Sequence, residues 1–108
     1  MVKAITLIKR KAGISREEFV KHYEEVHAPL ALKHFSFRRY VRNHIIPSGV
    51  EEPAFDCITE VWFDDMAKYH VGINFWQSEA GQVIRDDEES FMDRSKMVYF
   101  LVEEKVSP

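Results

Sequence analysis

A chain of 108 residues has the length of one domain, so we expect residues 1–108 to form a single domain. Its formal charge of −3 argues against nucleic-acid binding, because phosphate binding needs a clustered basic surface. One cysteine excludes an internal disulfide and a multi-cysteine metal site, and no apolar run approaches the roughly 20 residues of a membrane span. We therefore expect a soluble, cytoplasmic protein that binds neither nucleic acid nor membrane.

The first predicted elements are a strand over Val2–Ile8 and a helix that begins after Ser15. The strand is β-branched and apolar on both faces, which is typical of a strand covered on both sides. Ser15 and Glu18 have the spacing of a capping box, in which each side chain accepts a backbone N–H at the helix start. Pro29 disfavours helical geometry in the residue before it, so the helix is predicted to end near His27.

The rest of the chain predicts two more strands, a second helical region and a final strand. In order, these are a helical turn or loop over Leu30–His34, a strand over Phe37–Ile46, a loop over 47–53, a strand over Phe55–Phe63, a helix over Met66–Ile73 capped by Asp64 or Asp65, an irregular segment over 74–78, a helix capped by Ser78, and a strand over Met97–Val102. The order β-α-β-β-α-β is the pattern of ferredoxin-like α+β folds.

A ferredoxin-like sheet has helices on one face only, and the other face here would carry many apolar side chains. An exposed apolar patch of that size usually marks an interface. We therefore predict that two copies pair sheet to sheet across a twofold axis, as a homodimer that forms an α/β barrel.

His27, at the predicted end of the first helix, is the main candidate for chemistry. Burial favours the neutral ring of a histidine, whereas the negative end of a helix favours the cation. Because histidine titrates near neutral pH, His27 could transfer protons in a pocket between the helices and the sheet. The alternative is a buried histidine that only caps the last carbonyls of the helix.

The two middle strands supply candidate partners for this histidine. Tyr40 and His44 share one face of their strand, and Asp56, Glu60 and Trp62 share one face of theirs. Whether these faces lie on the same side of the sheet depends on strand register. The alternatives are a glutamate paired with an arginine and a tryptophan that only packs in the core.

The predicted site contains ten residues. The catalytic candidates are His27, Tyr40, His44 and Glu60, and the candidate ligand contacts are Tyr23, Asn43, Asp56, Trp62, Phe75 and Trp76. The last two lie in the irregular segment, where large aromatic side chains suggest a pocket lid.

The remaining polar features predict neither a metal nor a cofactor. His22 and His27 are five residues apart and diverge on an α-helix, and four scattered glycines cannot form a dinucleotide-binding loop. Val83, Ile84, Asp87 and Phe91 recur at helical spacing. We interpret the charge runs Lys9–Lys11 and Asp86–Glu89 as solvated, and Cys57 as an inert packing residue.

Several segments resemble EthD-family domains. They are Leu7–Phe19, His27-Ala28-Pro29-Leu30, Arg39-Tyr40 with Asn43-His44, Asp56, Glu60–Asp64, and Asp87 with Phe91–Asp93. The resemblance covers nearly the whole chain, and it implies a dimeric α+β-barrel domain. The family is named after a component of bacterial ethyl tert-butyl ether degradation and is associated with oxidoreductases. It is also similar to fungal polyketide-tailoring dehydratases and decarboxylases. Met66–Trp76 departs from the family pattern, so the ligand is not transferred.

The leading hypothesis is a homodimer that binds a small apolar or aromatic molecule, with His27 as the acid/base of the pocket. Its role would be oxidoreductase-associated or auxiliary in catabolism, without a cofactor. The alternatives are a cofactor-free polyketide cyclase or dehydratase-type lyase, a non-enzymatic small-molecule binding module, and a cofactor-free monooxygenase like those on similar dimeric barrels.

Overall fold

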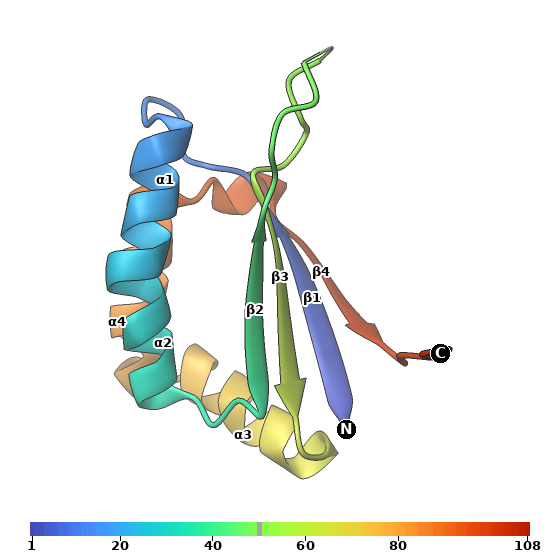
Figure 1. The fold of residues 1–108 in the computed structure, drawn as a ribbon. Coiled ribbons are helices and arrows are strands. Elements are labelled where there is room, and N and C mark those ends of the chain that lie inside the picture. Colours follow the sequence, from blue (N-terminus) through green and yellow to red (C-terminus); the bar gives the residue numbers. More distant parts are fainter. Residues whose placement is uncertain (50) are drawn as a thin grey trace.

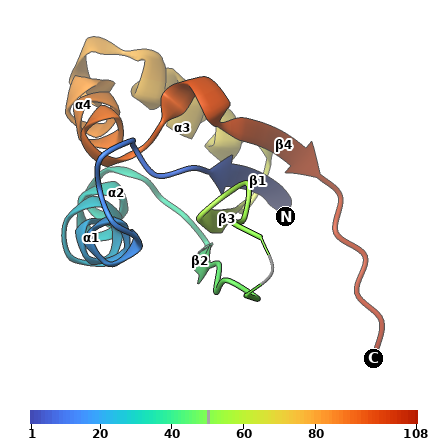
Figure 2. The same cartoon turned by 90° about the horizontal axis from the view of Figure 1, so that it is seen from above.

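A computed structural model describes residues 1–49 and 51–108, and it contains a four-stranded antiparallel sheet with helices on one face (Figure 1). The strands are β1 (Val2–Ile8), β2 (Arg39–His44), β3 (Cys57–Phe63) and β4 (Val98–Val102), in the spatial order β2-β3-β1-β4. The helical elements are α1 (Arg16–His22), the π-helix η1 (Tyr23–His27), α2 (Ala28–His34), α3 (Met66–Gln77), the 3-10 turns η2 (Glu79–Gly81) and η3 (Arg94–Lys96), and α4 (Gln82–Phe91). Seen from above, the main helices lie on one side of the sheet (Figure 2). The predicted ferredoxin-like α+β fold is confirmed.

The predicted helix starts are confirmed in detail. Ser15 Oγ accepts the backbone N–H of Glu18 at 3.1 Å, and the Glu18 carboxylate accepts the N–H of Ser15 at 3.1 Å. Such a cap contributes about 1 kcal/mol. Asp65 caps α3 by accepting the N–H three residues on at 2.8 Å, and the Ser78 hydroxyl accepts an N–H of η2.

The first helical region does not stop near His27, and that prediction is wrong. The chain forms one π-helical turn, in which the N–H of Ala28 bonds to the carbonyl of Tyr23 five residues back, and then continues as α2 to His34. Pro29 has no N–H to donate, and it lies in the first turn of α2, directly after the π turn. The wider turn therefore allows a proline inside a continuous helical rod.

The second helical region also differs from the prediction. The helix predicted over Met66–Ile73 extends to Gln77, so Phe75 and Trp76 lie in the last turn of α3 rather than in an irregular segment. Gly72 does not end the helix. A Cβ at Gly72 would lie 3.2 Å from the ring of Phe63, so the glycine lets α3 approach β3 closely. Among the described residues, no helix is long and apolar enough to cross a bilayer.

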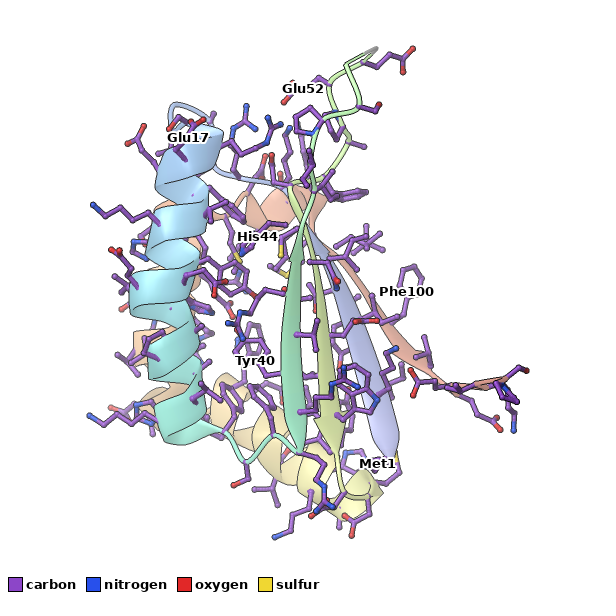
Figure 3. All side chains as sticks on the ribbon, viewed as in Figure 1. Met1, Glu17, Tyr40, His44, Glu52 and Phe100 are labelled. Carbon is purple, nitrogen blue, oxygen red and sulfur yellow. The ribbon has the colours of Figure 1, made fainter. Side chains whose placement is uncertain are left out.

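Strand register decides which side chains face the helices. Tyr40 pairs with Val61, and both lie on the covered face, whereas Glu60 and Trp62 lie on the open face. Tyr40 and His44 point toward the helices, and Phe100 points away from them (Figure 3). Half-buried apolar side chains also occupy the open face: Ile5, Leu7, Val41 and Ile58.

The bounds of β1 match the prediction, and the other three strands are shorter than predicted. The loop predicted over 47–53 includes Val50, which lies outside the described residues.

Two predictions about single residues near the core have different outcomes. Cys57 is fully buried, and burial raises the pKa of its thiol to about 11, which confirms an unreactive packing residue. The basic run Lys9–Lys11 is not simply solvated. Asp56, only 2% exposed, accepts the Arg10 backbone N–H at 2.8 Å and the Arg10 guanidinium at 2.7 Å. Because a buried carboxylate needs such partners, Arg10 is structural.

Candidate functional site

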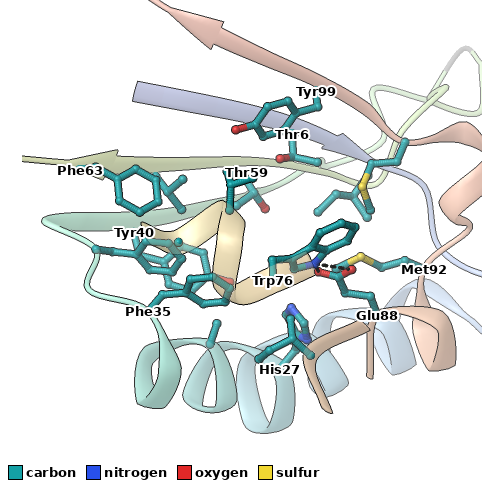
Figure 4. A pocket seen from close by; sticks show the side chains of 18 of the residues that line it. Thr6, His27, Phe35, Tyr40, Thr59, Phe63, Trp76, Glu88, Met92 and Tyr99 are labelled. Atoms are coloured by element: carbon teal, nitrogen blue, oxygen red, sulfur yellow. Dashed lines mark hydrogen bonds between the residues drawn. The ribbon is translucent and has the colours of Figure 1, made fainter. Parts of the chain in front are cut away.

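A cavity of about 330 Å³ lies between the helical layer and the covered face of the sheet. Aromatic side chains form much of its wall: Phe35, Phe37, Tyr40, Phe63, Tyr69, Trp76 and Tyr99. Figure 4 shows His27 on the helical side and Tyr99 on the strand side of this space. A mostly apolar cavity with a few polar groups is the usual form of a small-molecule site.

His27 lines the cavity and is held by a carboxylate on α4. Its Nδ1 lies 2.7 Å from Asp87 Oδ2, and the residue is 4% exposed. A carboxylate only accepts, so Nδ1 carries the proton and Nε2, at the far edge of the ring, keeps its lone pair. Within the described residues, Nε2 has no hydrogen-bond partner. Burial lowers the pKa of His27, and the Asp87 carboxylate acts against that shift. The lowered pKa favours the neutral form of the His27 ring.

A second histidine binds the other oxygen of the same carboxylate. His22 Nε2 lies 2.9 Å from Asp87 Oδ1, and its side chain is partly open to solvent. The prediction that His22 and His27 diverge is wrong, because it assumes α-helical spacing. In the π turn, backbone bonds join residues five apart, so the two rings lie on the same side of the helix.

Glu88 on α4 provides a second ionisable group in the cavity wall. The indole N–H of Trp76 donates to both of its carboxylate oxygens, at 3.3 and 3.2 Å (Figure 4). Burial raises the pKa of Glu88, while burial lowers that of His27. Both shifts have the same cause, because burial disfavours the charged form of a carboxylic acid and of an imidazole alike.

Three hydroxyl groups connect the helices to the covered face of the sheet. Tyr40 donates to the Tyr23 hydroxyl at 3.3 Å, and the oxygens of Tyr23 and Thr59 are 2.6 Å apart. Burial raises the pKa of Tyr40 to about 12 and that of Tyr23 well above its ordinary value, so both phenols stay protonated. They position and donate but do not act as bases.

Only part of the predicted site comes together. Four of its members line the cavity: Tyr23, His27, Tyr40 and Trp76. His44 also faces the helices, but its Nε2 binds Glu24 at 2.8 Å, and the ring is not in the wall of the cavity.

The other five predicted members lie elsewhere. Phe75 stacks on His34 with ring centroids 5.4 Å apart, and Asp56 is enclosed by the Arg10 contacts. The remaining three are on the open face of the sheet: Asn43, Glu60 and Trp62. Glu60 forms an ion pair with Lys3 at 2.9 Å, so it is a paired strand carboxylate, with a lysine in place of the expected arginine.

Two site residues, Asp87 and Glu88, were not predicted. The interpretation of Asp86–Glu89 as a solvated face is wrong for both, since each is half-buried against the helices or the cavity. A signal for Asp87 exists in the sequence: it repeats at helical spacing with Ile84 and Phe91, both buried. A carboxylate on an apolar stripe requires a partner.

Within residues 1–49 and 51–108, no group of three or more His, Cys, Asp or Glu side chains is arranged to hold a metal ion.

Comparison with known proteins gives one family. The EthD domain model matches residues 11–95. A Bacillus halodurans crystal structure described as an ethyl tert-butyl ether d (EthD) family protein is 25% identical, with a TM-score of 0.73, over 97% of this chain and 99% of that one. A hypothetical Arabidopsis thaliana protein (14% identity, TM-score 0.69, covering 99% and 90%) shares the fold. A Bacteroides fragilis protein described as dimeric and ferredoxin-like also shares the fold, with 12% identity, a TM-score of 0.64 and 94% of each chain covered.

No curated protein matches this chain significantly. The family model covers well over half of the chain, and it spans the helix that carries His27 as well as the helix that carries Asp87. The chain therefore belongs to the EthD family.

Proposed function

We propose that the protein binds a small apolar or aromatic molecule in the cavity between its helices and its sheet, with His27 as the acid/base. The observation that carries this proposal is the contact between His27 and Asp87 in the wall of an aromatic cavity. The carboxylate fixes one tautomer of the ring and leaves Nε2 free to accept a proton. Family membership is in line with an oxidoreductase-associated or auxiliary role in catabolism.

A second candidate is a cofactor-free lyase of the cyclase or dehydratase type. Such a step needs a base that removes a proton and an acid that protonates the leaving group. His27, whose pKa is lowered by burial, and Glu88, whose pKa is raised by burial, are suited to these two tasks. A binding module without catalysis would use the same cavity, but it would accelerate no reaction through His27 or Glu88.

The acid/base role is tested with 5-nitrobenzisoxazole, a bicyclic aromatic probe that opens when a base removes its C–H proton. We expect the wild-type protein to accelerate ring opening with saturation, and His27→Ala to lose about 10²-fold or more of that rate. The rate should fall at pH values below the lowered pKa of His27, because protonation removes the base. Absorbance of the phenolate product measures the rate.

His70→Ala is the matched control, because it removes an exposed histidine of α3 outside the cavity wall. It should keep the wild-type rate. A His27→Ala protein that is folded and equally fast would show that His27 is not the base. Wild-type protein without saturable acceleration would count against the enzyme candidates.

We also propose that two copies pair through the open faces of their sheets. Phe100 is 48% exposed there beside other apolar side chains, and the Bacteroides fragilis neighbour is described as dimeric. We expect light scattering at micromolar concentration to give the mass of two chains, and Phe100→Glu to give the mass of one, because the charge would have to be buried. Val71→Glu, on an exposed position of α3, should remain a dimer. A monomeric wild-type protein would refute the pairing.

A further inference from the structure

We propose that the cavity selects an uncharged, hydroxyl-bearing aromatic molecule of about two fused rings, whose O–H donates to His27 Nε2, and that it rejects aromatic carboxylates. The ligand must first enter this cavity, so the proposal rests on the function proposed for it. Size, charge and hydrogen-bonding capacity each support the proposal.

Cavity size sets the number of rings. An engineered apolar cavity of about 150 Å³ binds benzene. The cavity here, at about 330 Å³, is roughly twice as large, and its walls are aromatic. A flat molecule of two fused rings would fill it and would pack against the surrounding rings.

The charges around the cavity disfavour an anion. Among the described residues of its wall there is no lysine or arginine, and Glu88 is the only carboxyl group. Arg85 and Arg94 lie over the Trp76 ring at 5.8 and 5.2 Å from its centroid, and Arg42 lies over Tyr40, but none of the three lines the cavity. A ligand carboxylate would lose its water, meet neither a lysine nor an arginine in the wall, and lie in the same cavity as the Glu88 carboxyl group.

The hydrogen-bonding capacity that His27 and Glu88 leave unused in the cavity wall is that of acceptors. His27 Nδ1 is already bound to Asp87, which leaves the Nε2 lone pair, and among the described residues Glu88 accepts only the Trp76 indole N–H. The Tyr23 and Tyr40 hydroxyls are bound to each other. A ligand group that approaches His27 Nε2 therefore needs a donor, and an aromatic O–H provides one.

Tyr69 of α3 and Tyr99 of β4 together offer a complementary contact. The Tyr99 hydroxyl donates to the Tyr69 hydroxyl at 2.7 Å, and the Tyr69 O–H has no acceptor in the part of the chain that the structure describes. Tyr99 and His27 lie on opposite walls (Figure 4). A neutral oxygen at the far end of the ligand could accept from this pair, whereas the O–H at the near end donates to His27.

Three naphthalene probes of similar shape test the proposal by isothermal titration calorimetry at pH 7. Naphthalene measures the apolar contribution, 2-naphthol adds a neutral O–H, and 2-naphthoate adds a negative charge. We expect 2-naphthol to bind about 3–10-fold more tightly than naphthalene, as one net hydrogen bond allows. We expect 2-naphthoate to bind roughly tenfold or more weakly than 2-naphthol, because its charge is buried without a partner.

Two variants assign the selectivity to particular residues. His27→Phe should bind naphthalene normally but lose the preference for 2-naphthol, and Glu88→Gln should reduce the penalty on 2-naphthoate several-fold. Asp86→Asn, on an exposed position of α4, is the control for Glu88→Gln and should leave all three affinities unchanged.

Each outcome has a distinct meaning. If 2-naphthoate binds as tightly as 2-naphthol, the charge selection is overturned, whereas ligand binding in the cavity stands. If 2-naphthol binds no better than naphthalene, or keeps its advantage in His27→Phe, the contact with His27 is overturned. If none of the three probes binds, the proposed function fails together with this inference.

Discussion

Phe19→Ala is expected to lower the free energy of unfolding by about 3–5 kcal/mol, the usual cost of removing a buried phenylalanine ring. Phe19 is 0% exposed, and its ring lies against those of Tyr23 and Phe91, with centroids 5.9 and 5.3 Å away. The three rings come from α1, η1 and α4 and pack against one another. A methyl group in place of the ring would leave a void that the surrounding helices cannot close.

The change is measured by urea unfolding at one fixed protein concentration, because association would itself contribute to stability. Leu32→Ala is the control, since Leu32 is 56% exposed on α2, and it should cost no more than about 0.5 kcal/mol. Equal losses in the two variants would mean that the core is not centred on Phe19.

Asp87→Asn is expected to reduce the base-catalysed rate with 5-nitrobenzisoxazole by about 10²–10⁴-fold, the range for loss of one acid–base group. The Asp87 carboxylate holds the proton on Nδ1 of His27, whereas an amide can also donate, and it then favours the tautomer with the proton on Nε2. That tautomer has no lone pair at Nε2. The variant should therefore bind aromatic probes but fail as a base.

The same variant is expected to lower the pKa of His27 further. Burial is the largest cause of its lowered pKa, and Asp87 opposes it, so removing the carboxylate leaves burial unopposed. The folded pKa already lies below the value of about 6.5 for an unfolded histidine. The unfolded chain therefore binds more protons between the two values, and the His27 contribution to stability falls as the pH drops through that window.

Nitrogen-15 NMR of the imidazole rings reads both the tautomer and the pKa of His27 without any substrate. Asp86→Asn serves as the control, because Asp86 is exposed and binds Gln82 rather than a histidine. Its His27 signals should match those of the wild type. An unchanged tautomer in Asp87→Asn would refute the positioning role of Asp87.

The order of the elements could be predicted from local chemistry. The β-branched apolar run of β1, the Ser15–Glu18 cap and the Asp65 cap act within a few residues, and each is present in the structure. The π turn could not be predicted in this way. A rule that proline ends a helix assumes that the preceding turn is α-helical, and the turn before Pro29 is π-helical instead.

The site was harder to predict than the fold, because its contacts join distant parts of the chain. His27 could be singled out as a titratable residue at the edge of an apolar stripe. Its partner Asp87 lies 60 residues later, and the contact depends on how α4 packs against η1. Glu60 and Trp62 shared a strand face, but only the pairing of β2 and β3 shows that this face is turned away from the helices.

The single π turn also makes the helical rod sensitive to its length. An α-helix rotates by about 100° per residue, so one residue more or less in this turn would rotate every side chain that follows it relative to those before it. His22 belongs to the part fixed by the Ser15 cap, and the turn sets its phase relative to His27. A deletion of one residue between them would separate the two rings that now share Asp87, although every side chain in the site remained. The positions of His22 and His27 relative to Asp87 thus depend on the number of residues in the π turn as much as on which residues these are.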